Sequence, residues 1–344
     1  MPLNPVLESA HFIAEHSKDV SIDMNAVEKV ATMLFRQMEK TPYTTQVWRQ
    51  HPLNPSHPTE ATIDWIFVVD LLNFSFWSDA GEFSPDRYTV VYNGQSYTGY
   101  WALCACINRA IDEGLPMTQA SFYANATDEQ LSAIFRSDTS EQIPLLAERI
   151  RLLREAGQVL IKQYNGSFVH CVKAARKQAA HLLDLIVRSF AVFRDECQFA
   201  GRPVQFYKRA QILIADIWAC FDGEGLGEFV DIDHVTMFAD YRVPQSLAYL
   251  GLLQYSADLH AHLEADRPLD YGSRLEVEIR GNSIWAVEQL RQCMLVARSQ
   301  SASSSSSLPP INAILLDFYL WDFAKDNAQA LCNVPVHRTR SIFY

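Results

Sequence analysis

HCVKAARKQAAHLLDLIVRS (170–189) shows the pattern that decides the fold class. Its apolar side chains recur at intervals of three and four residues, which places them on one face of an α-helix. These side chains are Val172, Ala175, Ala179, Leu182, Leu183, Ile186 and Val187. The spacing predicts one amphipathic helix over 170–189, with its apolar stripe against a core.

The same period recurs through most of the chain. It predicts helices from Asp23, a suitable N-cap, to Lys40 and over 101–113, 128–136, 143–163, 207–220, 244–253, 282–298 and 312–325. Asn93-Gly94 separates two β-prone runs and favours a tight turn with positive φ at both positions, which predicts one β-hairpin. We therefore predict a mainly α fold with a small β-hairpin element.

Two further segments interrupt this pattern. The stretch 42–60 carries four prolines, which exclude a continuous helix or a central strand and predict an ordered loop. A serine-rich stretch at 299–310 lacks apolar side chains for a core and predicts a flexible surface loop. With no other shift in composition, we expect residues 1–344 to form a single large domain.

Composition and charge exclude several classes of protein. The 344 residues are 49% hydrophobic and 20% charged, as in a globular protein, and their net charge of −11 argues against binding to a nucleic-acid backbone. The longest apolar runs, 65–72 and 212–221, are far shorter than the roughly 18–20 residues of a membrane span. The N-terminus lacks the basic and apolar regions of a secretory signal, so we expect a cytoplasmic protein.

Three segments place carboxylates among apolar side chains, where an ionised group needs a partner or a ligand. In DWIFVVDLLNFSFW (64–77), Asp70 precedes aromatic residues that suit a flat heterocycle, although a core segment is the favoured interpretation. In TMFADYRVPQSLAYLG (236–251), Asp240 and Arg242 lie just before a predicted helix N-terminus. In INAILLDFYLWDFAKD (311–326), Asp317 and Asp322 would be about 140° apart on a helix, so one of them could face solvent.

Basic and metal-binding residues give weaker signals. Lys208 and Arg280 lie near apolar residues and could bind a phosphate, but salt bridges with Asp216, Glu276 or Glu278 are the commoner arrangement. The ten histidines form no HxxxH or HExxH pattern, and the seven cysteines no CxxC pair. We therefore expect no metal site and no metal or redox cofactor.

Several blocks together resemble the queuosine 5′-phosphate N-glycosylase/hydrolase family, the queuosine salvage proteins. They are SKDVSID (17–23), DWIFVVDLLNFSFW (64–77), YTGYWALCACINRAIDEGLP (97–116), FYKRAQILIADIW (206–218), TMFADYRVPQ (236–245), EVEIRG (276–281), LLDFYLWD (315–322) and PVHRTRSIFY (335–344). The resemblance implies a helical fold similar to that of DNA glycosylases. It also implies hydrolysis of the N-glycosidic bond of queuosine 5′-monophosphate, which releases the 7-deazaguanine base queuine for salvage into tRNA modification.

The resemblance also implies roles for particular residues. It matches Asp240 to the family's acidic site residue and Phe238 to a base contact beside it. Base-binding residues match Asp317, Phe318, where the family pattern has tyrosine, and Asp322. A family histidine most nearly matches His51, with His57 as the neighbouring alternative.

The chemistry of the residues agrees with this assignment. Cleavage of the C1′–N bond develops oxocarbenium character on the ribose, which a carboxylate such as Asp240 can stabilise. Asp317 and Asp322 can accept hydrogen bonds from the base or face the amine of queuine, and Lys208, Arg242 or Arg280 could hold the 5′-phosphate. A DNA or RNA base glycosylase and a non-catalytic queuine-binding protein remain as alternatives. We expect a small-molecule nucleotide substrate, no direct nucleic-acid binding and no membrane.

Overall fold

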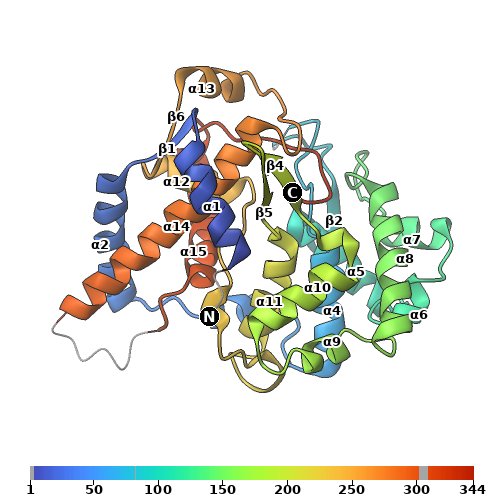
Figure 1. The fold of residues 1–344 in the computed structure, drawn as a ribbon. Coiled ribbons are helices and arrows are strands. Elements are labelled where there is room, and N and C mark those ends of the chain that lie inside the picture. The colour runs from blue at the N-terminus through green and yellow to red at the C-terminus, as the bar shows by residue number, and fades with distance from the viewer. Residues whose placement is uncertain (1–3, 82, 302–308) are drawn as a thin grey trace.

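The protein is mainly helical, as predicted, in a computed structural model that describes residues 4–81, 83–301 and 309–344. Figure 1 shows helices throughout the molecule and only short strands between them. The predicted serine-rich loop falls largely on 302–308, which lie outside the described residues. One continuous cluster of buried hydrophobic side chains runs from Val6 to Leu320, and the single-domain organisation stays a prediction.

The helices vary from one turn to more than seven. They are α1 (Pro5–His16), α2 (Met24–Lys40), α3 (Gln46–Gln50), α4 (Glu60–Leu71), α5 (Tyr100–Asp112), α6 (Ala120–Tyr123), α7 (Asp128–Ile134), α8 (Leu146–Gln163), α9 (Val169–Ala174), α10 (Ala179–Ser189), α11 (Lys208–Cys220), α12 (Arg242–Tyr249), α13 (Ala257–Glu264), α14 (Arg274–Gln300), α15 (Ala313–Asp326) and α16 (Ala328–Leu331). Asp23 caps α2 as predicted, because its side chain accepts hydrogen bonds from the N–H groups of Asn25 and Ala26.

The helix predicted over 170–189 is two helices. α9 ends at Ala174 and α10 begins at Ala179, because Arg176 and Lys177 have φ angles of 53° and 61°, outside the helical region. The apolar stripe is nevertheless correct: Leu182 and Ile186 are fully buried. The periodicity therefore identified the buried face but not the break between the helices.

Other helix limits also differ from the prediction. α14 begins at Arg274 instead of 282. α12 spans Arg242–Tyr249, so residues 250–253 of the predicted helix lie outside it. The proline-rich stretch 42–60 contains the five-residue helix α3. Helices α1, α4 and α13 were not predicted. For α4 the reason is that apolar residues surround the helix on all sides and hide its period.

The strands form three antiparallel pairs. β2 (Thr89–Tyr92) and β3 (Gln95–Thr98) make the predicted hairpin, with φ of 50° at Asn93 and 75° at Gly94. β4 (Glu196–Phe199) and β5 (Arg202–Gln205) make a second hairpin, while β1 (Val20–Ile22) pairs with the distant β6 (Leu253–Tyr255). The β1–β6 pair joins segments far apart in sequence, which a local pattern does not reveal.

Two groups of packed helices hold the functional region between them. α14 packs against α1 and α2, and α12 packs against α15. In Figure 1 these helices lie on one side of the molecule, with α4, α10 and α11 on the other. Every residue of α11 is buried, and α11 packs against α4, α10 and α3. No helix in the described ranges is long and apolar enough to cross a membrane.

Candidate active site

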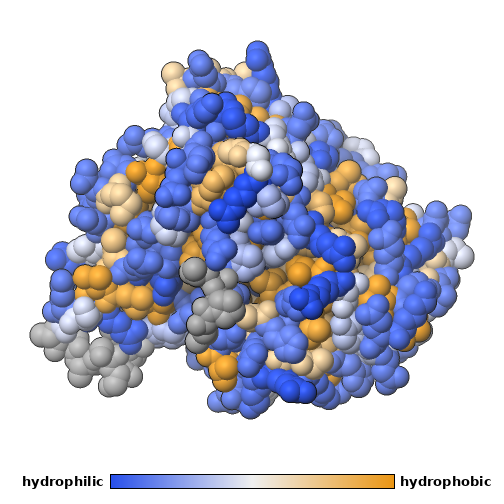
Figure 2. Space-filling model, in the orientation of Figure 1, coloured by the Kyte–Doolittle hydropathy of each residue, from blue (hydrophilic) through white to orange (hydrophobic). Residues whose placement is uncertain are grey.

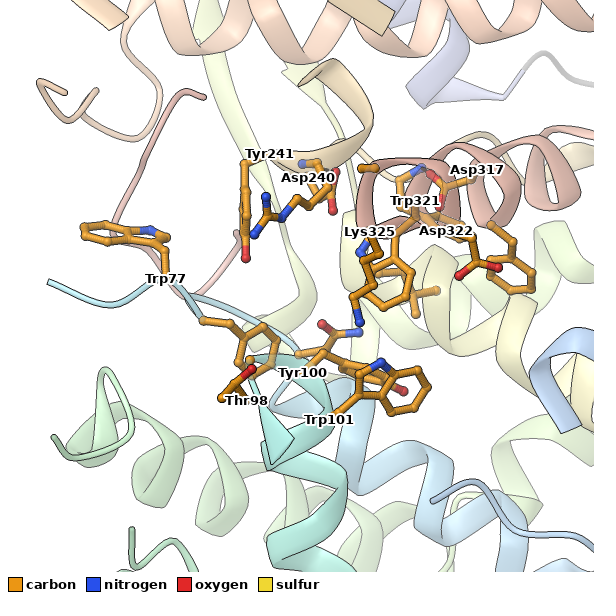
Figure 3. Close-up of a pocket in the computed structure, with 18 of the residues that line it drawn as sticks. Trp77, Thr98, Tyr100, Trp101, Asp240, Tyr241, Asp317, Trp321, Asp322 and Lys325 are labelled. Carbon is orange, nitrogen blue, oxygen red and sulfur yellow. Dashed lines mark hydrogen bonds between the residues drawn. The ribbon is translucent and has the colours of Figure 1, made fainter. Parts of the chain in front are cut away.

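A cavity of about 540 Å³ lies where these two groups of helices meet, and we call it the central cavity. Its walls come from 43–54, 73–78, 87–101, one face of α11, the segment 238–242, α15 and the C-terminal residues 336–344. This volume is within the roughly 300–1,000 Å³ of small-molecule sites. Figure 3 shows Asp240, Trp321 and Lys325 around the same space, with Tyr100 and Trp101 below them in this view.

Asp240 is held at the start of α12. Its Oδ1 accepts hydrogen bonds of 2.9 Å from the backbone N–H groups of Arg242 and Val243. None of the residues that the structure describes donates a hydrogen bond to Oδ2, and Asp240 lines the central cavity. Burial raises the pKa of Asp240, while Lys208 and the two backbone N–H groups favour its ionised form. The helix N-terminus therefore fixes one oxygen and leaves the other available to a ligand.

Asp317 joins α15 to the segment that carries Asp240. Its Oδ2 accepts a 2.8 Å hydrogen bond from the N–H of Phe238, and its side chain is almost fully buried. Burial and the nearby Asp240 raise the pKa of Asp317 well above its ordinary value. The site therefore holds two neighbouring carboxyl groups, and a cationic ligand would stabilise both of them in their ionised form.

Phe238 and Phe318 line the cavity beside these carboxyl groups. Their ring centroids are 6.3 Å apart and the ring planes meet at 52°. The rings therefore form an inclined apolar wall, on which a flat base can stack against one ring at a time.

Asp322 faces the cavity as well, although it is five residues from Asp317 on the same helix. Its Oδ2 accepts a 2.5 Å hydrogen bond from the hydroxyl of Tyr43, and burial raises its pKa. The alternative in which one of these two carboxylates faces solvent is thus wrong, because the cavity extends around a broad face of α15.

His51, and not His57, lies in the central cavity. Its ring stacks on Trp101 with centroids 3.3 Å apart and planes 8° apart. Its Nδ1 accepts a hydrogen bond from the N–H of Leu53, so the neutral ring carries its proton on Nε2. Burial, together with the charge of Lys325, lowers the pKa of His51 to about 4. His51 is therefore a neutral hydrogen-bond donor at physiological pH.

Of the three basic residues predicted to bind phosphate, Lys208 and Arg242 line the cavity. Burial lowers the pKa of Lys208 to about 8, although Asp240 acts in the opposite direction. The Lys208 ammonium donates a 3.3 Å hydrogen bond to the carbonyl of Asn73. Lys208 thus places a buried positive charge close to Asp240.

Arg280 does not line the cavity, and its predicted phosphate contact is wrong. Its guanidinium is completely buried and forms a bidentate ion pair with Asp195, through bonds of 2.9 and 2.5 Å. Glu276 lies on its other side at 3.4 Å, as the salt-bridge alternative predicted. The Nη donors of Arg280 are therefore occupied by protein carboxylates and its Nε donates to the carbonyl of Ala239, so its role is structural.

Several residues that line the cavity were not predicted from the sequence. Trp321 and Lys325 follow Asp317 at intervals of four on α15, and the Lys325 ammonium lies 3.9 Å from the centroid of the Trp321 ring. Tyr100 and Trp101 begin α5 directly after the predicted hairpin. The interval of four from Asp317 is the one signal that could have revealed Trp321 and Lys325.

These features define a helical protein with a cavity of small-molecule size. Carboxylates, aromatic rings and buried cations converge on that cavity, as in enzymes that act on small polar molecules. The chain belongs to the queuosine salvage protein family, whose model matches residues 53–344.

Individual relatives match over nearly the whole chain. A queuosine 5′-phosphate N-glycosylase/hydrolase from Nematostella vectensis is 47% identical over 98% of this chain and 97% of its own length. Proteins with the same name from Bos taurus and Mus musculus are 47% and 46% identical, over 98% and 100% of this chain and 98% and 99% of their own lengths. The family resemblance drawn from the sequence blocks is confirmed. The likeness to DNA glycosylases stays a prediction.

Proposed function

We propose that this protein hydrolyses the N-glycosidic bond of queuosine 5′-monophosphate and releases queuine. One observation carries the proposal: three carboxyl groups line one cavity together with the rings of Phe238 and Phe318. They are Asp240 and, on α15, Asp317 and Asp322; Asp240 and Asp317 are 77 positions apart in the chain. The names of its relatives, which match over nearly the full length, support an N-glycosylase/hydrolase.

In this proposal Asp240 acts on the ribose. Its Oδ2 faces C1′, where positive charge develops as the bond to the base breaks, and it either stabilises that charge directly or accepts a proton from the attacking water. The two backbone hydrogen bonds hold the carboxylate in place throughout the reaction. Because these bonds are already formed, the site needs little reorganisation at the transition state.

The remaining carboxylates and rings hold the base. Asp317 and Asp322 accept hydrogen bonds from the base or from the amine of queuine, whose positive charge offsets the burial of these carboxylates. One of the two phenylalanine rings supports the base by stacking, and His51 donates a hydrogen bond from Nε2. Lys208 and Arg242 are the candidates for the 5′-phosphate. No metal or redox cofactor, nucleic acid or membrane enters this reaction, and we propose a cytoplasmic location.

The test uses purified protein, queuosine 5′-monophosphate and chromatographic detection of free queuine. Asp240→Asn keeps the Oδ1 acceptor but removes the negative charge, so we expect kcat/KM to fall by at least about 100-fold with an unchanged circular dichroism spectrum. Asp233→Asn, an exposed carboxylate just before this segment, is the matched control and should retain normal activity.

Three results would contradict the proposal. Near-normal turnover by Asp240→Asn would remove Asp240 from its role. Tight binding of queuine without any release from the nucleotide would identify a carrier. Cleavage of bases from oligonucleotides but not from the mononucleotide would instead identify a nucleic-acid glycosylase.

A further inference from the structure

Two carboxyl groups, Asp216 on α11 and Asp70 on α4, lie deep in the protein beside the central cavity, and the proposed reaction does not yet use them. Asp216 lines the cavity with its side chain 4% exposed, whereas Asp70 is fully buried behind it. Lys208 and Ile212 precede Asp216 at intervals of four, so one face of α11 carries all three into the cavity wall. A ligand in the cavity can therefore reach Asp216, and Asp216 lies near enough to Asp70 to act on its charge.

Within the described chain, Asp70 lacks the partners that a buried carboxylate requires, whereas Asp216 accepts a hydrogen bond from the indole of Trp48. Oδ1 of Asp70 accepts one hydrogen bond of 3.3 Å from Asn73, and its buried Oδ2 has no partner among the described residues. Neither carboxyl group has a lysine or arginine nitrogen within salt-bridge distance in the described part of the chain. A buried, unpaired ionised oxygen is costly, so the pair is more stable when it holds a proton.

The nearest cations do not neutralise the pair. Lys208 donates to the carbonyl of Asn73, and the guanidinium of Arg209 donates to the carbonyls of Leu71 and Val192. Burial raises the pKa of both carboxyl groups, and Asp216 raises that of Asp70 further. Two adjacent carboxyl groups in a dry site commonly share one proton.

Other ionisable groups act on the pair from each neighbouring element. They are Lys208, Arg209 and Cys220 on α11, Tyr100 and Cys104 on α5, and Asp317 on α15, with the polar indole of Trp48 on α3. Apart from Lys208 and Arg209, these groups are neutral or negative near pH 7. Lys208, Arg209 and the hydrogen bond from Trp48 favour the ionised carboxylates, whereas burial, the largest influence on both groups, favours retention of the proton.

The proposed reaction needs such a proton. A 7-deazaguanine has carbon in place of the ring nitrogen at which guanine is readily protonated, so the departing base must receive a proton elsewhere, on its pyrrole or pyrimidine nitrogens. We propose that Asp216, backed by Asp70, is the general acid that protonates queuine as it leaves. This inference rests on the proposed function and adds a second catalytic carboxyl group to Asp240.

The step balances with water as the only co-reactant. The C1′–N bond breaks and its electron pair stays with the base, which takes the proton of the Asp216 carboxyl group. The water oxygen forms the new bond to C1′, and the proton that it loses passes to Asp240. Proton exchange with solvent after product release restores both carboxyl groups.

The decisive experiment compares two leaving groups. The base of queuosine 5′-monophosphate needs a proton donor to leave. The para-nitrophenolate of para-nitrophenyl ribofuranoside 5′-phosphate leaves as a stable anion and needs none. We expect Asp216→Asn to lower kcat/KM by at least about 100-fold for the nucleotide and by less than about fivefold for the nitrophenyl substrate. Asp64→Asn is the control, because Asp64 is a largely buried carboxylate outside the cavity that bonds Ser167 and Phe168. It should leave the ratio of the two rates unchanged.

The pH dependence of kcat/KM gives an independent readout on the nucleotide alone. Burial raises the pKa of Asp216 to about 7, so the unaltered protein should lose nucleotide activity as the pH rises through this region, and this alkaline limb should be absent in Asp216→Asn. Equal losses on both substrates in Asp216→Asn, or an alkaline limb that persists in Asp216→Asn, would overturn the proposal. Asp216→Glu, which keeps an acid, should retain more nucleotide activity than Asp216→Asn. Failure of the unaltered protein to hydrolyse the nucleotide would instead contradict the proposed function.

Discussion

At the residue scale, the site depends on how burial and neighbouring charges act on each ionisable group. Asp240 lies between opposing influences: burial favours its neutral form, while Lys208 and two backbone N–H groups favour the carboxylate. Lys208 has the reciprocal environment, because burial favours the neutral amine and Asp240 favours the ammonium. Each residue therefore stabilises the charged form of the other.

Replacement of Lys208 by methionine tests this coupling. The loss of the positive charge raises the pKa of Asp240. Because the carboxylate is the active form in the proposed reaction, the acidic limb of kcat/KM should move to higher pH. The measurement is a pH profile of queuine release. Lys177→Met, which removes an exposed lysine paired with Glu228, is the control and should leave the limb in place. An acidic limb that stays in place in Lys208→Met would contradict the coupling.

His51 offers a second test at this scale. Phenylalanine keeps a ring to stack on Trp101 but lacks the Nε2–H donor, so His51→Phe should raise KM by roughly 3- to 10-fold, the value of one hydrogen bond. Because the pKa of His51 is lowered to about 4, the ratio of variant to normal activity should be constant from pH 6 to 8. A ratio that changes across this range would show that His51 titrates.

At the element scale, close packing of α1 against α14 forms one side of the molecule. Gly281 is the contact point: a Cβ atom there would lie under 3.0 Å from three side-chain atoms of Ile13. The preceding residue of α14, Arg280, forms an ion pair with Asp195, which lies just before β4. α14 therefore connects the α1 contact to the region around Lys208, whose backbone N–H also bonds Asp195.

Gly281→Ala should destabilise the protein, although alanine favours a helix by about 1 kcal/mol over glycine. The added methyl group overlaps Ile13, and such overpacking typically costs about 1–3 kcal/mol. Urea unfolding measures the change in the free energy of unfolding. The double variant Gly281→Ala with Ile13→Ala should lose less stability than the sum of the two single variants, because the smaller side chain makes room. Additive losses would contradict the packing argument.

At the scale of the whole molecule, the net charge of −11 opposes binding to polyanions. Figure 2 shows a face covered largely by hydrophilic residues, with smaller apolar areas between them. The basic residues of the site are instead inside the cavity, where Lys208 is 5% exposed. They can bind a phosphate on a small molecule that enters, but they do not form an extended basic surface.

We therefore expect negligible affinity for duplex DNA and for tRNA at physiological salt, and no steep increase as salt is lowered from 200 to 50 mM. Fluorescence anisotropy with labelled nucleic acids measures both. Micromolar binding with a steep salt slope would contradict a mononucleotide substrate and favour a nucleic-acid glycosylase.

The sequence by itself determined the fold class and the β2–β3 hairpin, and it supplied most of the candidate residues that line the cavity. Helix period and turn chemistry are local, and family blocks such as TMFADYRVPQ (236–245) carry the candidate site residues within a few positions. These signals do not depend on what packs against them.

Only the tertiary structure decided which of those residues share a cavity. Lys208 and Arg280 look alike in sequence, but only Lys208 lines the cavity. The guanidinium of Arg280 forms an ion pair with Asp195, which is 85 positions away in the chain. Asp70 and Asp216 become a pair only because α4 packs against α11. Burial and the nearness of distant charges set the chemistry of a carboxyl group, and both arise from contacts between segments that are far apart in the chain.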